Sequence, residues 1–187
     1  TLTATPNIAA NENGWNNSDV TISFEASDAL SGGVSNPDSQ VFGEGADQTA
    51  TASVTDLAGN TTTIQYQHIN IDKTAPTLTA ARDIAANENG WSNSDVTVSF
   101  EASDALSGVA GNPASQVVGE GFDQTATGTV TDLAGNSASV SLGNINVDQT
   151  APTLTATRDI AANEYGWTNS DVTVSFEASD ALSGGVS

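Results

Sequence analysis

Positive charge is the first property that the sequence lacks. Its 187 residues include 23 Asp and Glu but only 3 Lys and Arg, which gives a formal net charge of -20 at pH 7. Without a basic surface a protein cannot neutralise phosphate groups, so nucleic acids and anionic membrane surfaces are excluded as partners. Only 14% of residues are charged, so the acidity reflects the scarcity of Lys and Arg. The favoured ligand is therefore a cation.

Cysteine is absent altogether. This absence excludes a disulfide framework, a thiolate metal site and a cysteine nucleophile. The sequence also contains no run of about 18 apolar residues, the length that a membrane-spanning helix requires. Thr1–Ala4 has neither the basic nor the apolar region of a signal peptide, so we expect no such peptide here.

The dominant feature is an internal repeat. Trp15, Trp91 and Trp167 follow one another at intervals of 76 residues, and a Thr-Leu-Thr-Ala run returns at the same interval. The first two copies agree at about 53 of 76 positions without a gap. We therefore predict three domains with boundaries 1–76, 77–152 and 153–187, of which the last is a partial copy of about 35 residues.

Within one copy, apolar residues alternate with polar ones. Val96, Val98, Phe100 and Ala102 share one face of a predicted half-buried strand. Further short strands are expected around 78–80, 126–131 and 137–142, and no segment has a helical period. A hairpin turn is predicted at 132–136, with Gly135 at positive φ, and a bulge near 143–144. The fold class is therefore all-β, with small Greek-key β-sandwiches in tandem.

The copies join at two similar segments, Asp72–Pro76 and Asp148–Pro152. Proline fixes its own φ and restricts the preceding residue to extended conformations, so we expect short, stiff linkers. Modules joined in this way would form an extended rod.

Four motifs carry a resemblance to a known family: Asp-x-Thr-Ala-Pro at the linkers, and the segments 90–98, 102–109 and 131–136. They resemble the tandem bacterial Ig-like repeats of large cell-surface and biofilm adhesins, over essentially the whole chain. The resemblance implies an extracellular, non-enzymatic stalk on a bacterial surface. It also implies calcium at the junctions between modules, where the ion stiffens the array.

Catalysis is disfavoured by the sequence. His68 is the only histidine, and the second copy has Asn144 at the equivalent position, so a Ser-His-Asp arrangement would exist once only. Pairs of carboxylates such as Glu101 and Asp104 occur, but a narrow sandwich has no cleft to raise the pKa of one of them. We expect no enzymatic activity.

A calcium site assembled from separate loops is the stronger hypothesis. Calcium prefers hard oxygen ligands, and the sequence has no contiguous calcium-binding loop. In an Ig-type topology the arriving linker, the loop after the second strand and the last hairpin turn share one pole, which brings Asp72, Asp104, Asp132 and Asn136 together. The alternative is that Asp104 and Asp132 only cap turns. The counterparts in the other copies complete the set of candidate ligands: Asp148, Asp180, Asp28 and Asp56.

Two functions remain open. In the first, the modules form a spacer that projects a binding domain from the cell. In the second, they form a self-assembling extracellular filament or matrix, because strands of the partial third copy would have free edges for neighbouring chains. A sugar-binding platform of Trp15, Trp91 and Trp167 is less favoured than a packing role for these residues.

Overall fold

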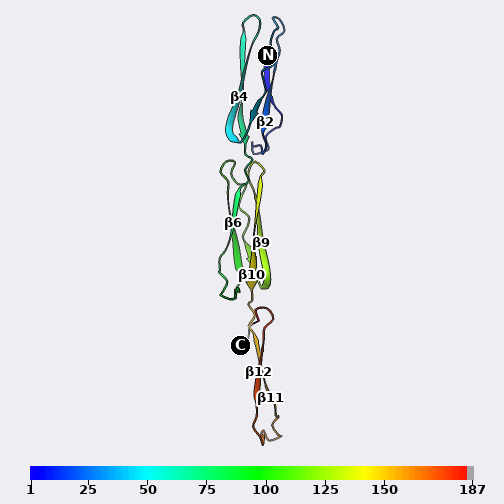
Figure 1. The fold of residues 1–187 in the computed structure, drawn as a ribbon, viewed down its shortest axis with the longest axis vertical. Helices are drawn as coiled ribbons and strands as arrows, with labels where there is room; N and C mark the ends of the chain where they lie inside the picture. Colours follow the sequence, from blue (N-terminus) through cyan, green and yellow to red (C-terminus); the bar gives the residue numbers. More distant parts are fainter. Residues whose placement is uncertain (185–187) are drawn as a thin grey trace. The chain divides into compact units, whose positions relative to one another are not determined.

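The computed structural model describes residues 1–184, and this part of the chain is built from twelve β-strands without a helix. The predicted all-β class is therefore confirmed, and no helix in this range could cross a membrane. The strands are β1 Leu2–Pro6, β2 Val20–Ala26, β3 Gln40–Phe42, β4 Gly45–Thr55, β5 Thr61–Ile71, β6 Thr77–Arg82, β7 Val96–Ser103, β8 Gln116–Val118, β9 Gly121–Thr131, β10 Ser137–Val147, β11 Thr153–Arg158 and β12 Val174–Ser179 (Figure 1).

The first 71 residues form two small antiparallel sheets. One sheet has the order β1-β2-β3, and the other consists of β4 and β5. β1 pairs with β2 from Leu2 opposite Ala26 to Pro6 opposite Ile22. β2 contacts both strands of the other sheet, so the two sheets form a β-sandwich-like arrangement.

One hydrophobic core lies between these two sheets. Alternate residues of β2 point into it, and β5 supplies residues from the opposite side. Alternation of this kind follows from the period of two residues in a strand, which places every second side chain on the same face. The buried members are Leu2, Val20, Ile22, Phe24, Ala50, Ala52, Ile69 and Ile71.

The second copy repeats these elements. β6, β7 and β8 form a three-stranded sheet, and β9 pairs with β10. The alternation predicted for β7 is confirmed: Val96, Val98 and Phe100 are buried and Ala102 is half-buried. The segment Asp72–Pro76 lies between the end of β5 and the start of β6.

Of two local backbone predictions, the turn is confirmed, and the bulge of the second copy stays a prediction that the first copy supports. Gly135, in the turn between β9 and β10, has a φ of 102°. Near the expected bulge, Asn144 has a φ of 54°, and its first-copy counterpart His68 has a φ of 61°. In the first copy the register between β4 and β5 is irregular from Gly45 to Ala50. An extra residue in one strand produces this kind of irregularity.

The third copy contributes β11 and β12, which pair with each other from Thr153 opposite Ser179 to Arg158 opposite Val174. Every residue of both strands is exposed. The hairpin therefore presents an apolar face that its counterparts in the first copy bury.

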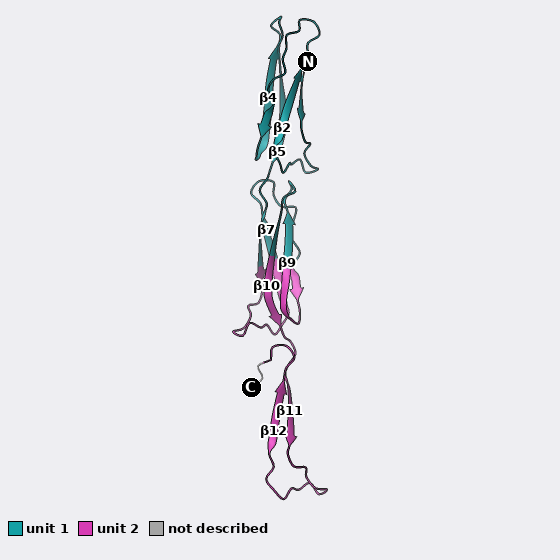
Figure 2. Cartoon of the chain, turned by 45° about the vertical axis from the view of Figure 1, so that its right-hand side comes forward, with its two compact units in different colours: residues 1–80, 100–114, 127–140 teal, residues 81–99, 115–126, 141–187 magenta. Residues whose placement is uncertain are grey.

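The chain divides into two compact units whose border does not follow the repeat. Unit 1 consists of residues 1–80, 100–114 and 127–140, and unit 2 of residues 81–99, 115–126 and 141–187 (Figure 2). β6, β7, β9 and β10 each contribute residues to both units. The boundaries at 76 and 152 stay a prediction from the sequence.

Candidate metal centre

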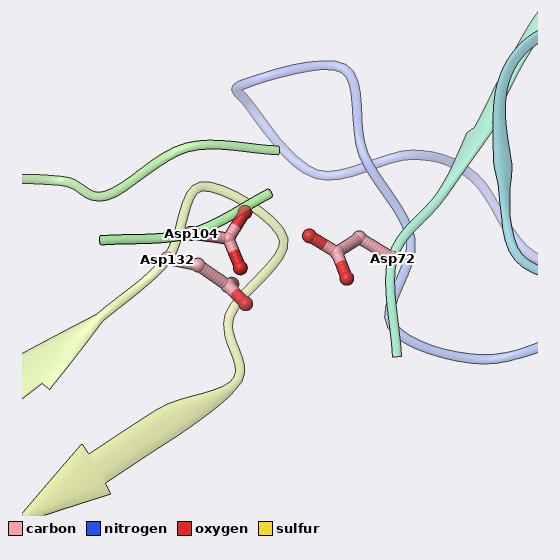
Figure 3. A group of neighbouring side chains, drawn as sticks. All are labelled: Asp72, Asp104 and Asp132. Atoms are coloured by element: carbon pink, nitrogen blue, oxygen red, sulfur yellow. The ribbon is translucent and has the colours of Figure 1, made fainter. Parts of the chain in front are cut away.

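Three carboxylates from distant parts of the sequence meet inside unit 1. Asp72 follows β5, Asp104 follows β7, and Asp132 begins the turn between β9 and β10. One oxygen from each lies within 4.8 Å of the others. Figure 3 shows the Asp72 carboxylate pointing toward the other two. It is the only such group of acidic or histidine side chains in residues 1–184.

Asp72 is fully buried and hydrogen-bonded through both oxygens. Oδ1 accepts from the Thr74 N–H at 3.0 Å, and Oδ2 accepts from the Ser107 N–H at 2.9 Å. Burial raises the pKa of Asp72, but the neighbouring Ser107 and the Thr74 N–H together lower it more, so the net pKa lies below its usual value. Asp72 is therefore held as an anion even without a cation.

Asp104 and Asp132 each organise a tight turn. Asp104 Oδ1 accepts from the N–H groups of Leu106 at 3.0 Å and Gly108 at 2.8 Å. Asp132 Oδ1 accepts from the N–H groups of Gly135 at 2.7 Å and Asn136 at 2.8 Å. The turn-capping role considered for these residues is thus present. It fixes where the carboxylates point and does not prevent the remaining lone pairs from binding a cation.

Beside the carboxylates lies a polar atom without a partner. The Ser107 hydroxyl oxygen is buried and makes no hydrogen bond of acceptable geometry, although the hydroxyl is close enough to Asp72 to help lower the pKa of that carboxylate and the Ser107 N–H bonds to it. Buried hydroxyl groups almost always have a partner, and an unmade bond costs about 1–3 kcal/mol. The Ser107 oxygen is a further hard ligand in reach of the same centre.

The spacing suits a calcium ion. Calcium binds oxygen at about 2.3–2.6 Å, so two ligands on opposite sides of one ion are separated by about 4.6–5.2 Å. The three carboxylate oxygens fall within that limit. Carboxylates this close repel one another, and a divalent cation between them would convert the repulsion into attraction.

The amide of Asn136 faces this centre with its nitrogen. Nδ2 donates to Asp132 Oδ2 at 2.8 Å and to the backbone carbonyl of Asp72 at 2.8 Å. In this arrangement Asn136 joins the turn to the end of β5. Its role as a metal ligand stays a prediction.

The linker is also bonded to loop residues of the first copy that lie just before β2 and β4. Lys73 Nζ lies 2.7 Å from Asp19 Oδ1, and Thr74 Oγ1 donates to Glu44 Oε1 at 2.6 Å. Each of these contacts is exposed and contributes little alone. Together with the bonds at Asp72, they restrain three successive linker residues.

The counterpart residues form incomplete versions of the centre. Asp148 Oδ2 accepts from the Ser183 N–H at 3.0 Å, and Asp180 Oδ1 accepts from the Gly184 N–H at 2.9 Å, so two carboxylates repeat the arrangement. Contacts with Ser183, first its hydroxyl and then its N–H, lower the pKa of Asp148. In the first copy, Asp28 and Asp56 cap their own turns. Neither pair belongs to a group of three within the described residues.

The structure also shows the surroundings of His68 and of the three tryptophans singled out in the sequence. The His68 side chain is exposed and lies 2.8 Å from Asp47, which is also exposed. Trp15 and Trp91 are half-buried, and Trp91 packs on Phe122 with ring centroids 5.8 Å apart. Trp167 is exposed. The Trp91–Phe122 contact could not be predicted from the repeat, because the first copy has Ala46 at the position of Phe122.

No family model and no curated protein matches this sequence. The resemblance to bacterial Ig-like adhesin repeats therefore stays a prediction from the motifs. What can be said of function rests on the internal repeat and on the geometry of the carboxylate centre.

Proposed function

We propose that the chain is a non-enzymatic structural spacer of a bacterial surface adhesin. Its sandwiches act as tandem Ig-like modules, and calcium binds where one sequence copy follows another. In this function the modules provide length and hold a binding domain away from the cell. The close similarity of the copies supports a mechanical role, since we expect recognition surfaces to diverge between copies.

The observation that carries the proposal is the convergence of Asp72, Asp104 and Asp132 beside the unpartnered Ser107 hydroxyl. These groups come from a linker and from two loops more than 25 residues apart in the sequence. An ion bound to all of them would cross-link the linker to both loops. The free energy of binding would then oppose any motion that separates these segments.

The stiffening of the linker by calcium has a direct physical reason. Without an ion, the hydrogen bonds at Asp72 and Asn136 hold the linker against the turn, while repulsion among the carboxylates opposes that contact. Bound calcium removes the repulsion and adds ligand bonds. The linker would thus be stiff in calcium-rich surroundings outside the cell and looser where calcium is scarce.

Calorimetric titration of the whole chain with CaCl2 tests the proposal. We expect one saturable site with a dissociation constant in the range of about 10⁻⁴ to 10⁻³ M, as in other extracellular calcium modules. The melting temperature should rise with calcium, because only the folded chain forms the site. The substitution Asp104→Asn should remove both effects.

Asp28→Asn is the matched control. Asp28 accepts the same turn hydrogen bonds as Asp104, from Leu30 and Gly32, but belongs to no group of three carboxylates within the described residues. Calcium binding by D28N should equal that of the unmodified chain. Absence of saturable binding at millimolar calcium, or equal losses in D28N and D104N, would contradict the proposal.

A further inference from the structure

The loop between β1 and β2 holds an asparagine followed by a glycine, Asn13 and Gly14, in a tight turn. Asn11 Oδ1 accepts from the Asn13 N–H at 2.9 Å and from the Trp15 N–H at 3.0 Å. The Gly14 N–H donates to the Asn11 carbonyl at 2.9 Å. Gly14 has a φ of 80°, a conformation that glycine adopts without strain. The shape of the turn therefore determines the glycine of this dipeptide.

A different contact determines the asparagine. Asn13 Nδ2 donates to the backbone carbonyl of Leu133 at 3.2 Å. The corresponding turn of the third copy has Tyr165 at this position, and its N–H still donates to Asn163 Oδ1 at 3.0 Å. A turn of this shape thus forms without asparagine at its third position. The amide of Asn13 serves the contact with Leu133 instead.

The two requirements together create a dipeptide with a characteristic reaction. Deamidation is easiest where glycine follows asparagine, because glycine has no side chain to obstruct ring closure. The backbone nitrogen of the glycine attacks Cγ of the asparagine, and the side-chain amide leaves as ammonia with the proton of that nitrogen. Water then opens the five-membered succinimide at one of its two carbonyl groups. The products are aspartate and isoaspartate, and water is the only co-reactant.

The surroundings of Asn13 permit this reaction. Asn13 is exposed, and a Cβ placed on Gly14 would meet no atom within 4 Å, so neighbouring segments leave space around this peptide bond. The hydrogen bond from the Gly14 N–H to the Asn11 carbonyl slows the attack, because the nitrogen must lose this proton. Opening of an exposed loop costs little free energy compared with unfolding, so the nitrogen is repeatedly released.

We propose that Asn13 is a site of spontaneous deamidation, and that the modification weakens the contact between the loop at 11–15 and the turn at 132–136. Aspartate at position 13 has no side-chain N–H, so the Leu133 carbonyl loses one of its two side-chain donors. The new carboxylate also places a second acceptor opposite that carbonyl oxygen. Asn11 Nδ2, at 2.9 Å, remains as the other donor. Deamidation therefore loosens this contact and leaves the strands intact.

Incubation of the full chain at mildly alkaline pH in EDTA, followed by peptide mapping with mass spectrometry, tests the reaction. We expect aspartate and isoaspartate to accumulate at position 13. The rate should be at least about tenfold lower than in a synthetic peptide of residues 7–18, which lacks the closed turn. The peptide map separates this position from Asn89, which also precedes a glycine.

Asn13→Gln is the control for the chemistry. Glutamine keeps the side-chain amide, but attack by the next nitrogen closes a six-membered ring, which is far slower. No product should form at position 13 of N13Q in the period that the unmodified chain requires.

Asn13→Asp measures the consequence, because it introduces one of the two products directly. Hydrogen exchange in the turn at 132–136 should become about two- to tenfold faster, the change expected for the loss of one hydrogen bond. Asn89→Asp is the matched control. It adds the same charge in the corresponding turn of the second copy, and Leu133 accepts its side-chain bonds from Asn11 and Asn13. Exchange at 132–136 should be unchanged in N89D.

Three results would overturn the inference. The first is the absence of both products at position 13 over an incubation many times longer than the peptide requires. The second is equal product formation in N13Q, and the third is exchange at 132–136 that N13D leaves unchanged. None of these measurements depends on calcium, so all of them can be made in EDTA and their failure is separate from failure of the calcium site.

Discussion

The side chain of Asn136 reaches the backbone carbonyl of Asp72 at 2.8 Å, 64 residues away in the sequence. The same amide nitrogen also bonds to Asp132 Oδ2 at 2.8 Å. One side chain thus connects the end of the first copy to the last turn of the second. This contact holds the carboxylates of Asp72 and Asp132 close to each other before any cation binds.

Replacing Asn136 by alanine should therefore destabilise unit 1. The change leaves a partly buried acceptor without its donor, which costs about 1–3 kcal/mol. Asn60→Ala is the control, because Asn60 makes the same bond within its own turn, to Asp56 Oδ2 at 2.9 Å, but lies on the exposed turn. Denaturant unfolding in EDTA should show a larger loss for N136A than for N60A. Equal losses would mean that the bond to Asp72 contributes nothing.

The lowered pKa of Asp72 predicts a dependence of stability on pH. Because the native pKa lies below the usual value of 3.8, the stabilisation is complete above pH 3.8 and is lost as the pH falls through the native pKa. The net lowering means that the contacts with Ser107, Thr74 and Asp104 together outweigh the effect of burial, which alone would raise the pKa. Asp72→Asn should thus be less stable than the unmodified chain at pH 7, even in EDTA.

Unfolding of both proteins between pH 2 and pH 7 tests this sign. The difference in free energy of unfolding should be constant above about pH 5 and should shrink as the pH falls through the native pKa of Asp72, because the unmodified chain then becomes protonated at this position as well. A difference that stays the same down to pH 2 would show that the charge of Asp72 is not its source.

Much of this fold could be predicted from the sequence, because the relevant information is local. The alternation of Val96, Val98 and Phe100 follows directly from the strand period, and the turn at Gly135 follows from the backbone freedom of glycine. The repeat added further information, since each copy had to contain the same strands. These predictions needed no knowledge of which distant segments meet.

The candidate site was predictable only through topology. Asp72, Asp104 and Asp132 were placed together by an argument about loops that share one pole, and the structure finds one oxygen of each within 4.8 Å of the others. Two features of the site could not be predicted. They are the position of the Ser107 hydroxyl beside the carboxylates and the orientation of Asn136, whose amide nitrogen faces them. Both depend on side-chain positions set by packing between the two copies, which no local pattern encodes.

The bulge at His68 gives a prediction with two opposite substitutions. His68 has a φ of 61°, a conformation in which asparagine is favoured and β-branched residues are strained. His68→Asn copies the residue that the second copy has there, Asn144, and should change the stability by less than about 0.5 kcal/mol. His68→Val should cost about 1–3 kcal/mol. Thermal unfolding of both variants checks this, and an H68V protein as stable as H68N would contradict the strain.

The choice between calcium and magnesium follows from ligand spacing and from the rigidity of the turns. Magnesium requires oxygen at about 2.0–2.1 Å in near-ideal octahedral geometry, which limits opposite ligands to about 4.2 Å. Asp104 and Asp132 are each fixed by two backbone hydrogen bonds, so their loops resist any adjustment toward the near-ideal octahedral geometry that magnesium requires. At 1 mM, calcium should therefore raise the melting temperature more than magnesium, and EDTA should reverse the effect. If both ions raise the melting temperature equally, and D104N shows the same rise, the ions only screen the net charge of -20.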